Sequence, residues 1–258
     1  MAARILAVAN QKGGVGKTTT SLSLGGALAR KGKRVLVLDL DPHACATLHA
    51  RLYPETVTVS LYELFVAKES EWPAVWEQLI HTQAISGMDI APGSIRLNDL
   101  EDVMHNRTCK GTILARAVRK VRDRYDFIVL DCPPHMCLML VNALLASDLL
   151  IIPIQTDFLA LHGLRLLFDS LHTLNKVLPS PIRYRAVATM YDKRAKACMH
   201  VLDLLRKKMD GAIFETVIGV DTRFREASAL GCTIFDIDPK SRGACSYADM
   251  AEEVLKLW

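Results

Sequence analysis

The segment NQKGGVGKTT, residues 10–19, holds the residues best suited to binding phosphate groups. Its glycines let the backbone turn tightly and point N–H groups inward, and they are Gly13, Gly14 and Gly16. In loops of this kind, the following lysine reaches the β- and γ-phosphates and the next hydroxyl binds Mg²⁺. Lys17 and Thr18 are the candidates for these contacts, at the start of a predicted helix whose positive end also favours an anion.

This phosphate loop (residues 10–19) departs from the strict pattern G-x-x-x-x-G-K-[ST]. Gln11 stands where the first glycine belongs, and a second lysine, Lys12, lies five residues before Lys17. The spacing alone gives Lys12 no role in the loop's own phosphate contacts.

Carboxylates end two of the apolar strands. Asp131 stands at the end of FIVLD, where an Mg²⁺-associated carboxylate belongs in a nucleotide-binding sheet. Asp39 and Asp41 bracket Leu40 at the end of another strand, and strand alternation predicts that both point towards the phosphate edge. A turn or helix cap before Pro42 is the alternative explanation for this pair.

Apolar runs and helical patterns alternate along the chain. The predicted strands are residues 4–10, 33–41, 127–134, 149–155 and 184–191. Their continuous rather than alternating hydrophobicity is typical of parallel strands buried on both faces. The predicted helices are 17–31, 60–67, 73–82, 95–105, 110–123, 138–146, 159–177, 195–209 and 244–257.

This order predicts an α/β fold with a doubly wound, mostly parallel sheet and helices on both faces, as one domain over residues 1–258. The phosphate loop, DLDP and DCPP each follow a strand, so all three should converge at the carboxyl edge of the sheet, where such sheets bind ligands.

Composition narrows the setting. The chain has 258 residues, half of them hydrophobic, and a net charge of +4, which permits an acidic partner without requiring one. Seven cysteines without a C-x-x-C pair, and no signal peptide, predict a reduced cytoplasmic protein. The histidines show no metal-ligand spacing, and polar residues interrupt the most apolar run, 138–154, before it reaches membrane-spanning length.

Several motifs together resemble the short, Soj-like ParA branch of the ParA/MinD family of deviant Walker-A ATPases. They are KGGVGKTTT, VLDLDP, FIVLDCPP, ATMYDKR and DPKSRGACSYADMAEEVL. The resemblance runs from about Arg4 to the C-terminus and is weakest over 50–108. It implies a P-loop ATPase that binds ATP and Mg²⁺ and hydrolyses ATP slowly.

The resemblance also gives the site residues their roles. It implies that Lys12 crosses to the nucleotide of a partner subunit in an ATP-bound homodimer, that Asp41 positions the attacking water, and that Asp39 and Asp131 support the Mg²⁺ site with Thr18. Thr19 is expected at the α-phosphate. The implied nucleotide-binding residues of the loop are Lys12, Gly13, Gly14, Val15, Gly16, Lys17, Thr18 and Thr19.

The nucleoside side differs from the family pattern. Short ParA proteins carry Ile-Pro-Arg-Asn-Val-Arg where this chain has IGVDTR, residues 218–223. Gly219 and Asp221 occupy the positions that contact the nucleoside there. Met190, at the end of its strand, is either a further base contact or a core methionine.

A basic excess lies between Arg183 and Arg225, with ten Lys or Arg and five Asp or Glu. Charge alone is consistent with an ordinary solvated helix face. The resemblance instead places nonspecific duplex DNA on this surface, through Arg194 and Arg223. Lys196, Arg225 and Arg242 are expected to extend this DNA-binding patch. Contacts of this kind are independent of base sequence and sensitive to salt.

The resemblance therefore implies a switch ATPase that segregates a plasmid or chromosome, associates with the nucleoid and responds to a ParB-like activating partner. VDTRFREAS also resembles ParA-like proteins that position chemotaxis arrays or other protein clusters. A MinD-like membrane-surface ATPase is the alternative from another class, but the tail ADMAEEVLKLW is too acidic for membrane binding. A cluster-binding metabolic enzyme would need bridging cysteines, and Cys132 is expected to be a core or loop residue.

Overall fold

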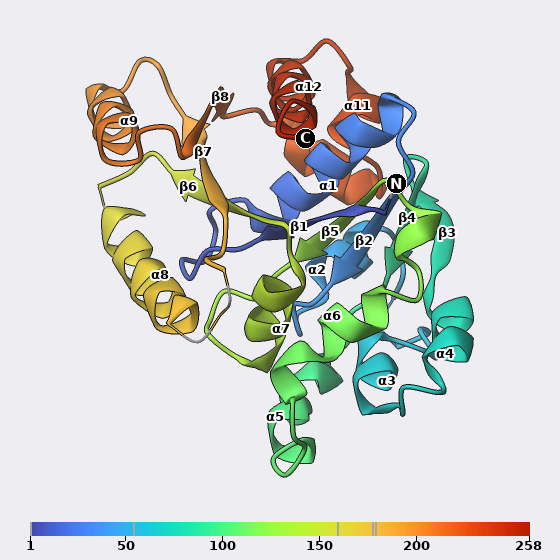
Figure 1. The fold of residues 1–258 in the computed structure, drawn as a ribbon. Coiled ribbons are helices and arrows are strands. Elements are labelled where there is room, and N and C mark those ends of the chain that lie inside the picture. The colour runs from blue at the N-terminus through green and yellow to red at the C-terminus, as the bar shows by residue number, and fades with distance from the viewer. Residues whose placement is uncertain (1, 54, 159, 177, 179) are drawn as a thin grey trace.

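A computed structural model describes residues 2–53, 55–158, 160–176, 178 and 180–258, and within them one eight-stranded sheet forms the centre of the molecule (Figure 1). The strand order is β3-β4-β2-β5-β1-β6-β7-β8, and all paired neighbours are parallel except β3 and β4. The strands are β1 Arg4–Val8, β2 Val35–Asp39, β3 His81–Ile85, β4 Met88–Ala91, β5 Phe127–Asp131, β6 Leu149–Gln155, β7 Tyr184–Tyr191 and β8 Ile213–Gly219.

Two separate hydrophobic clusters, one on each face of the sheet, form the core. The first packs the sheet against α3 Leu61–Val66, α4 Trp72–Leu79, α6 Ile113–Val118, α7 Leu138–Ala146, α8 Ala160–Asn175 and α9 Lys196–Lys208. The second packs the other face against α1 Lys17–Arg30, α2 Cys45–His49, α11 Ile234–Ile237 and α12 Arg242–Leu255. Every residue of β2 and β5 is buried, as the continuous apolar runs predict, and the expected doubly wound α/β fold is confirmed.

The edges of the sheet differ from the prediction. The sequence pattern misses β3, β4 and β8, because β3 is short and polar and β8 is an edge strand with exposed positions. The predicted helix 73–82 ends at Leu79, and His81 begins β3. Edge strands are exposed on one side and so lack the apolar continuity that reveals central strands.

Several helices are shorter or divided. The region 95–105 contains a 3₁₀ turn, Ile95–Asp99, and α5 Leu100–Val103. The region 110–123 contains a 3₁₀ turn, Lys110–Thr112, followed by α6, and the 3₁₀ turn Arg122–Arg124 begins at its end. The short helices α2, α11 and α10 Arg223–Leu230 have too few turns for a clear helical pattern. The ends of the predicted helix 159–177 lie outside the described residues.

The register of the central strands sets the functional edge. Asp39 of β2 is level with Asp131 of β5, and Asp131 is level with Val8 of β1. The chain enters the phosphate loop directly after β1, so both carboxylates lie beside that loop. In the part of the chain that the structure describes, no helix combines the length and apolar character needed to cross a membrane.

Candidate nucleotide-binding site

At two positions, the backbone of the phosphate loop adopts a conformation that only glycine reaches without strain. Gly14 and Gly16 have φ angles of 73° and 89°, and α1 begins immediately afterwards at Lys17. Nothing lies within 4 Å of a Cβ built on either glycine, so backbone angle rather than crowding requires them.

Side-chain hydrogen bonds fasten this loop to the neighbouring strands. Asn10 donates from Nδ2 to the Pro153 carbonyl on β6, at 2.7 Å, and accepts the Lys12 N–H at its Oδ1. Thr189 on β7 donates its hydroxyl to the Val15 carbonyl at 2.9 Å. These contacts hold the loop in place against β6 and β7.

Lys17 lies at the bottom of the loop, 9% exposed. Its ammonium is within 3.4 Å of the Lys12 carbonyl. Burial lowers the pKa of Lys17, while the charges of Asp131 and Asp41 act in the opposite direction. Because its hydrogen bond to the Lys12 carbonyl is long, the buried Lys17 ammonium can donate to the oxygens of a phosphate group that enters the site.

Asp131 receives two hydroxyl donors from the first two turns of α1. Thr18 donates to Oδ2 at 2.7 Å, and Ser21, one turn later, donates to Oδ1 at 2.8 Å. Burial raises the pKa of Asp131, and these two hydrogen bonds lower it in part. A buried carboxylate beside a threonine hydroxyl at a phosphate loop is the donor set that Mg²⁺ prefers.

Asp39 and Asp41, predicted to act together, lie in different surroundings. Asp39 is fully buried and accepts the N–H and hydroxyl of Thr47 at Oδ2, at 2.8 and 2.7 Å. Burial and the nearby Asp131 raise the pKa of Asp39. Asp41 instead lines the cavity and accepts from the N–H and the ring of His43, both at 2.9 Å.

A cavity of about 430 Å³ brings together two of the predicted catalytic residues, Lys17 and Asp41. Its walls include loop residues Gly13 to Thr19 with the exception of Val15, and also Asp41, His43, Cys45, His49 and Pro134. Lys17, Thr18 and Asp41 therefore face one space that a polyphosphate can occupy.

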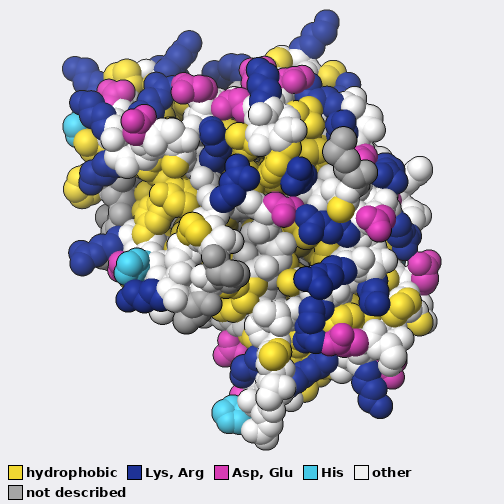
Figure 2. Space-filling model, in the orientation of Figure 1, with side chains coloured by type: hydrophobic (Ala, Val, Ile, Leu, Met, Phe, Trp, Pro, Cys, Tyr) yellow, Lys and Arg dark blue, Asp and Glu magenta, His cyan; other side chains and the backbone are white. Residues whose placement is uncertain are grey.

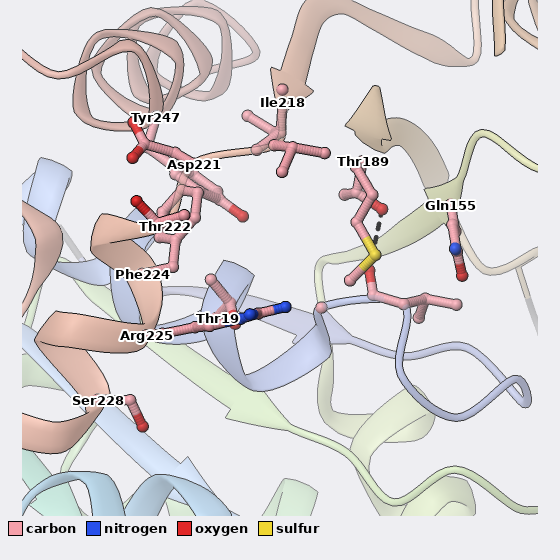
Figure 3. A pocket seen from close by; sticks show the side chains of 15 residues that line it. Thr19, Gln155, Thr189, Ile218, Asp221, Thr222, Phe224, Arg225, Ser228 and Tyr247 are labelled. Atoms are coloured by element: carbon pink, nitrogen blue, oxygen red, sulfur yellow. Dashed lines mark hydrogen bonds between the residues drawn. The ribbon is translucent and has the colours of Figure 1, made fainter. Parts of the chain in front are cut away.

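A second cavity of about 690 Å³ continues from the first and shares Gly16, Thr19, Met190, Phe224 and Ser228 with it. Figure 3 shows its side chains converging from α1, α10, α12 and the ends of β6, β7 and β8. Its size and its mixture of apolar and polar walls suit a nucleoside.

The structure brings all three predicted nucleoside contacts to this second cavity. Met190, Gly219 and Asp221 line it, and Met190 has a positive φ of 52° that turns the chain at the strand end. The Asp221 carboxylate is occupied by backbone donors, because Oδ1 accepts the Arg223 N–H and Oδ2 the Gly243 N–H, each at 3.1 Å. Asp221 thus shapes the wall through its backbone and its buried side chain.

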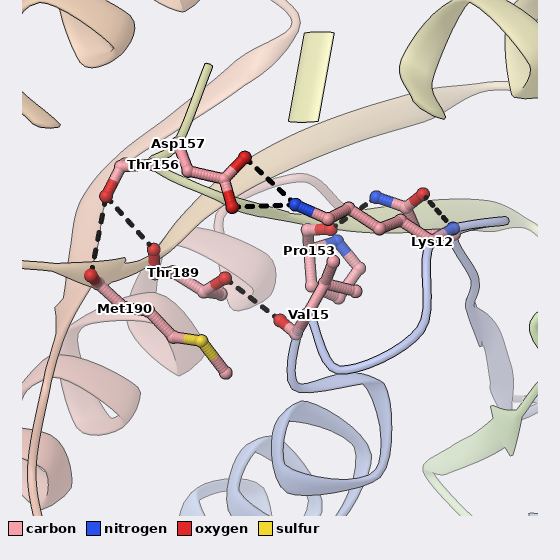
Figure 4. Close-up of polar contacts among 8 residues, drawn as sticks. Lys12, Val15, Pro153, Thr156, Asp157, Thr189 and Met190 are labelled. Atoms are coloured by element: carbon pink, nitrogen blue, oxygen red, sulfur yellow. Dashed lines mark hydrogen bonds and ion pairs between the residues drawn. The ribbon is translucent and has the colours of Figure 1, made fainter. Parts of the chain in front are cut away.

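Lys12 does not point into either cavity. Figure 4 shows its side chain extended to Asp157, with Nζ at 2.9 Å from Oδ1 and 2.7 Å from Oδ2. The pair is partly exposed, so water remains available to replace it.

The predicted DNA-binding residues fall in three places. Arg194 and Arg223 line a groove of about 670 Å³ together with Lys193 and Arg242. Lys196 begins α9, over which Lys and Arg side chains gather at the upper left of Figure 2, with acidic side chains among them. Arg225 lines the nucleoside cavity and is absent from the walls of this groove.

Acidic neighbours partly compensate the charges in this groove. Arg194 is 85% exposed and forms two hydrogen bonds with Asp192, at 3.0 and 2.8 Å. Arg223 lies 3.1 Å from Asp238. Exposed pairs of this kind are weak, so a polyanion can displace the carboxylates.

Sequence reasoning missed four residues that complete the site: Ser21, Thr47, Asp157 and His43. The spacing of Thr18 and Ser21, three residues apart on one helix, was the available signal for Ser21. Asp157 is 145 residues from Lys12, and nothing local in the sequence indicates that contact.

Known proteins resemble this chain in sequence over nearly its full length. Residues 3–183 match the model of a family described as an AAA domain. The chain is 36% identical to the sporulation initiation inhibitor protein Soj of Bacillus subtilis, over 97% of this chain and 98% of that protein. It is 31% identical to the chromosome partitioning protein ParA of Myxococcus xanthus, over 98% of this chain and 88% of that protein.

Solved structures share the fold. Cobyrinic acid a,c-diamide synthase from Mycobacterium smegmatis, with bound ADP and magnesium, has a TM-score of 0.83 and 29% identity over 99% of this chain and 95% of that chain. A Cyanothece McdA variant in complex with ATP has a TM-score of 0.85 and 19% identity over 98% of this chain and 96% of that chain, a likeness of fold alone.

Proposed function

We propose, from the premise that this chain belongs to the family of Soj and the ParA chromosome partitioning proteins, that it is a partitioning ATPase whose ATP-bound form dimerises and binds DNA. The ParA relative is named for chromosome partitioning, and the Soj relative is named as a sporulation initiation inhibitor. The proposal for this chain rests on its own site as well as on that likeness.

One observation carries the proposal: Thr18 and Ser21 donate to the two oxygens of Asp131 at the base of a glycine loop that also presents Lys17. This arrangement pairs an Mg²⁺ donor set with a phosphate cradle, and the nucleoside cavity continues from it. A simple anion site would need neither the carboxylate nor the second cavity.

The residues present fit a nucleoside triphosphate with Mg²⁺. The loop N–H groups and Lys17 would hold the phosphates, and Thr18, Asp131 and Asp39 would hold the ion, directly or through water. Bound Mg²⁺ would neutralise charge on the phosphate oxygens. Met190, Gly219 and Asp221 would enclose the nucleoside, as adenosine in our proposal.

Two residues would control turnover. Asp41 lines the phosphate cavity and would orient the attacking water, and His43 would orient Asp41 through its ring hydrogen bond. Lys12 would leave Asp157 and contact the phosphates of a partner subunit, which makes dimerisation depend on nucleotide. Positioning of this kind without strong general-base assistance is consistent with slow hydrolysis.

The groove lined by Arg194 and Arg223 would bind the phosphates of duplex DNA, with Lys196 beside it on α9. A homodimer would present two such grooves, so binding of one duplex would strengthen with dimerisation. We propose on the same grounds a ParB-like partner that stimulates hydrolysis, and a location on the nucleoid in the cytoplasm.

The direct test combines nucleotide, DNA and membrane arms. Purified protein with Mg²⁺ and a slowly hydrolysed ATP analogue should elute as a dimer and retard two unrelated duplexes, whereas ADP should give neither result. Vesicles of anionic lipid should not pellet the protein in either state. Binding of the analogue without a dimer or DNA retention would reject the partitioning role, and ATP-dependent pelleting with vesicles would favour a membrane-surface ATPase.

A further inference from the structure

We infer that Arg225 binds the α-phosphate of the nucleotide, an inference that rests on the proposed ATP site and deepens it. The sequence predicted that Arg225 extends the DNA-binding patch, but its place in the fold separates it from the groove that Arg194 and Arg223 line. Its chemistry and surroundings are those of an anion contact inside the nucleotide site.

Arg225 stands in the first turn of α10 and lines the nucleoside cavity together with Gly16 and Thr19. In Figure 3 its side chain extends from α10 across the cavity towards Thr19 at the start of α1. The guanidinium of Arg225, from the α10 wall, therefore approaches the backbone N–H groups at the start of α1 on the other wall.

Three cations around the two cavities and the groove have carboxylate partners, and in the described part of the chain Arg225 has none. Arg223 contacts Asp238, Arg194 contacts Asp192 and Lys12 contacts Asp157. Within the described part of the chain, no hydrogen bond or ion pair links the Arg225 side chain to another residue. Asp221 is the only acidic residue that lines the cavity, and its two oxygens accept from backbone N–H groups.

The charges on the two walls favour an anion between Arg225 and α1. In Figure 3 the Arg225 side chain extends towards Thr19, in the first turn of the 14-residue helix α1 and so at its positive end. Positive groups gathered in this way repel one another until a negative group separates them. A guanidinium is also the side chain best shaped to grip two phosphate oxygens at once.

The position selects the α-phosphate rather than the γ-phosphate. Arg225 lines only the nucleoside cavity and is absent from the smaller cavity where Lys17, Thr18 and Asp41 converge. Thr19 lines both, so it marks the junction between nucleoside and polyphosphate. The phosphate at that junction is the one attached to the ribose, which ATP and ADP share.

The experiment measures Mg²⁺-dependent binding of ATP and of ADP by calorimetry, for wild type and for Arg225→Ala, Arg225→Lys and Arg119→Ala. Arg225→Ala should weaken ATP and ADP by the same factor, about tenfold to a hundredfold, because a hydrogen-bonded charge contact to the shared phosphate is lost. Arg225→Lys should recover part of this loss. Arg119 is exposed at the end of α6, on the other face of the sheet, so Arg119→Ala is the matched control and should change neither affinity.

A DNA arm separates this role from the earlier assignment. At saturating ATP analogue, Arg225→Ala should bind duplex DNA with the salt dependence of wild type. Unchanged ADP affinity in Arg225→Ala, or a loss confined to ATP or to DNA, would overturn the α-phosphate contact and leave the ATP site intact. Failure of the wild-type chain to bind either nucleotide would overturn the proposed function itself.

Discussion

Lys12 and Asp157 form a two-pronged ion pair within one chain, with the lysine Nζ 2.7 Å from Oδ2 and 2.9 Å from Oδ1 of the aspartate (Figure 4). The pair joins the phosphate loop to the segment after β6. In the proposed dimer, the Lys12 ammonium would instead contact the nucleotide of the partner subunit. The proposed dimer therefore requires the pair to separate.

Lys12→Ala should bind ATP as a monomer but form no stable dimer and hydrolyse no ATP, because Lys17 and the loop N–H groups remain while the contact to the partner's phosphates is lost. Light scattering with ATP analogue and a phosphate-release assay measure the two effects. Lys120→Ala, which removes an exposed lysine elsewhere, is the control. A normal ATP dimer of Lys12→Ala would reject the role in the partner's site.

Asp157→Asn should have the opposite effect on the dimer. Loss of the carboxylate charge frees Lys12 at lower cost, so half-maximal dimerisation should occur at a severalfold lower ATP concentration. Titration with ATP analogue, followed by sedimentation, gives that midpoint. A midpoint shifted to higher ATP would mean that Asp157 supports the dimer-competent position of Lys12.

Lys17→Ala and Asp41→Ala should separate binding from turnover. Lys17→Ala loses the buried phosphate cation and should weaken ATP binding by about a hundredfold or more. Asp41→Ala keeps the phosphate cradle, so it should bind ATP and dimerise yet hydrolyse at least about a hundredfold more slowly. Calorimetry and single-turnover kinetics distinguish the two. Wild-type turnover by Asp41→Ala would reassign Asp41 to a structural role.

Arg194→Glu and Arg223→Glu should each weaken DNA binding without changing ATP-driven dimerisation, because both residues line the groove outside the nucleotide cavities. Each lost phosphate contact should reduce the slope of log K against log salt by about one unit. Electrophoretic shifts on two unrelated duplexes at several salt concentrations measure this slope. Loss of binding to only one of the duplexes would indicate base readout in place of phosphate contacts.

Asp39→Asn should stabilise the nucleotide-free protein at pH 8 and change it little at pH 5. Burial beside Asp131 raises the pKa of Asp39 to about 7, above the ordinary value of 3.8. The folded chain therefore holds this proton more tightly than the unfolded chain, and the stability from this group falls as pH rises from about 4 to about 7. At pH 8 the buried, ionised carboxylate therefore lowers the free energy of unfolding by about 1–4 kcal/mol, and a neutral asparagine avoids this loss.

Denaturant unfolding of both proteins at the two pH values, without Mg²⁺ or nucleotide, measures this difference. The N–H and hydroxyl of Thr47 can still donate to the side-chain oxygen of the asparagine in the variant. A loss of these two hydrogen bonds should therefore not obscure the effect of charge. An asparagine variant equally destabilised at pH 5 and pH 8 would show that the charge of Asp39 is already compensated in the free protein.

The sequence by itself determined the sheet centre, the phosphate loop and the groups at the carboxyl edge. Strands β1, β2, β5 and β6 are almost entirely buried and β7 is buried in its middle, and that burial requires the continuous apolar runs visible in the sequence. Parallel strands then carry their following loops to one edge. Lys17, Thr18, Asp41 and Asp131 could be grouped on this rule alone.

Only the tertiary structure decided how those groups differ from one another. Asp39 and Asp41 share a strand end, yet one is buried against Thr47 and the other faces the cavity, because the chain turns after β2. The partner of Lys12 and the place of Arg225 depend on contacts between segments far apart in the chain. Local periodicity reports the burial of an element, whereas such contacts follow from how the packed elements orient their ends, which no local pattern records.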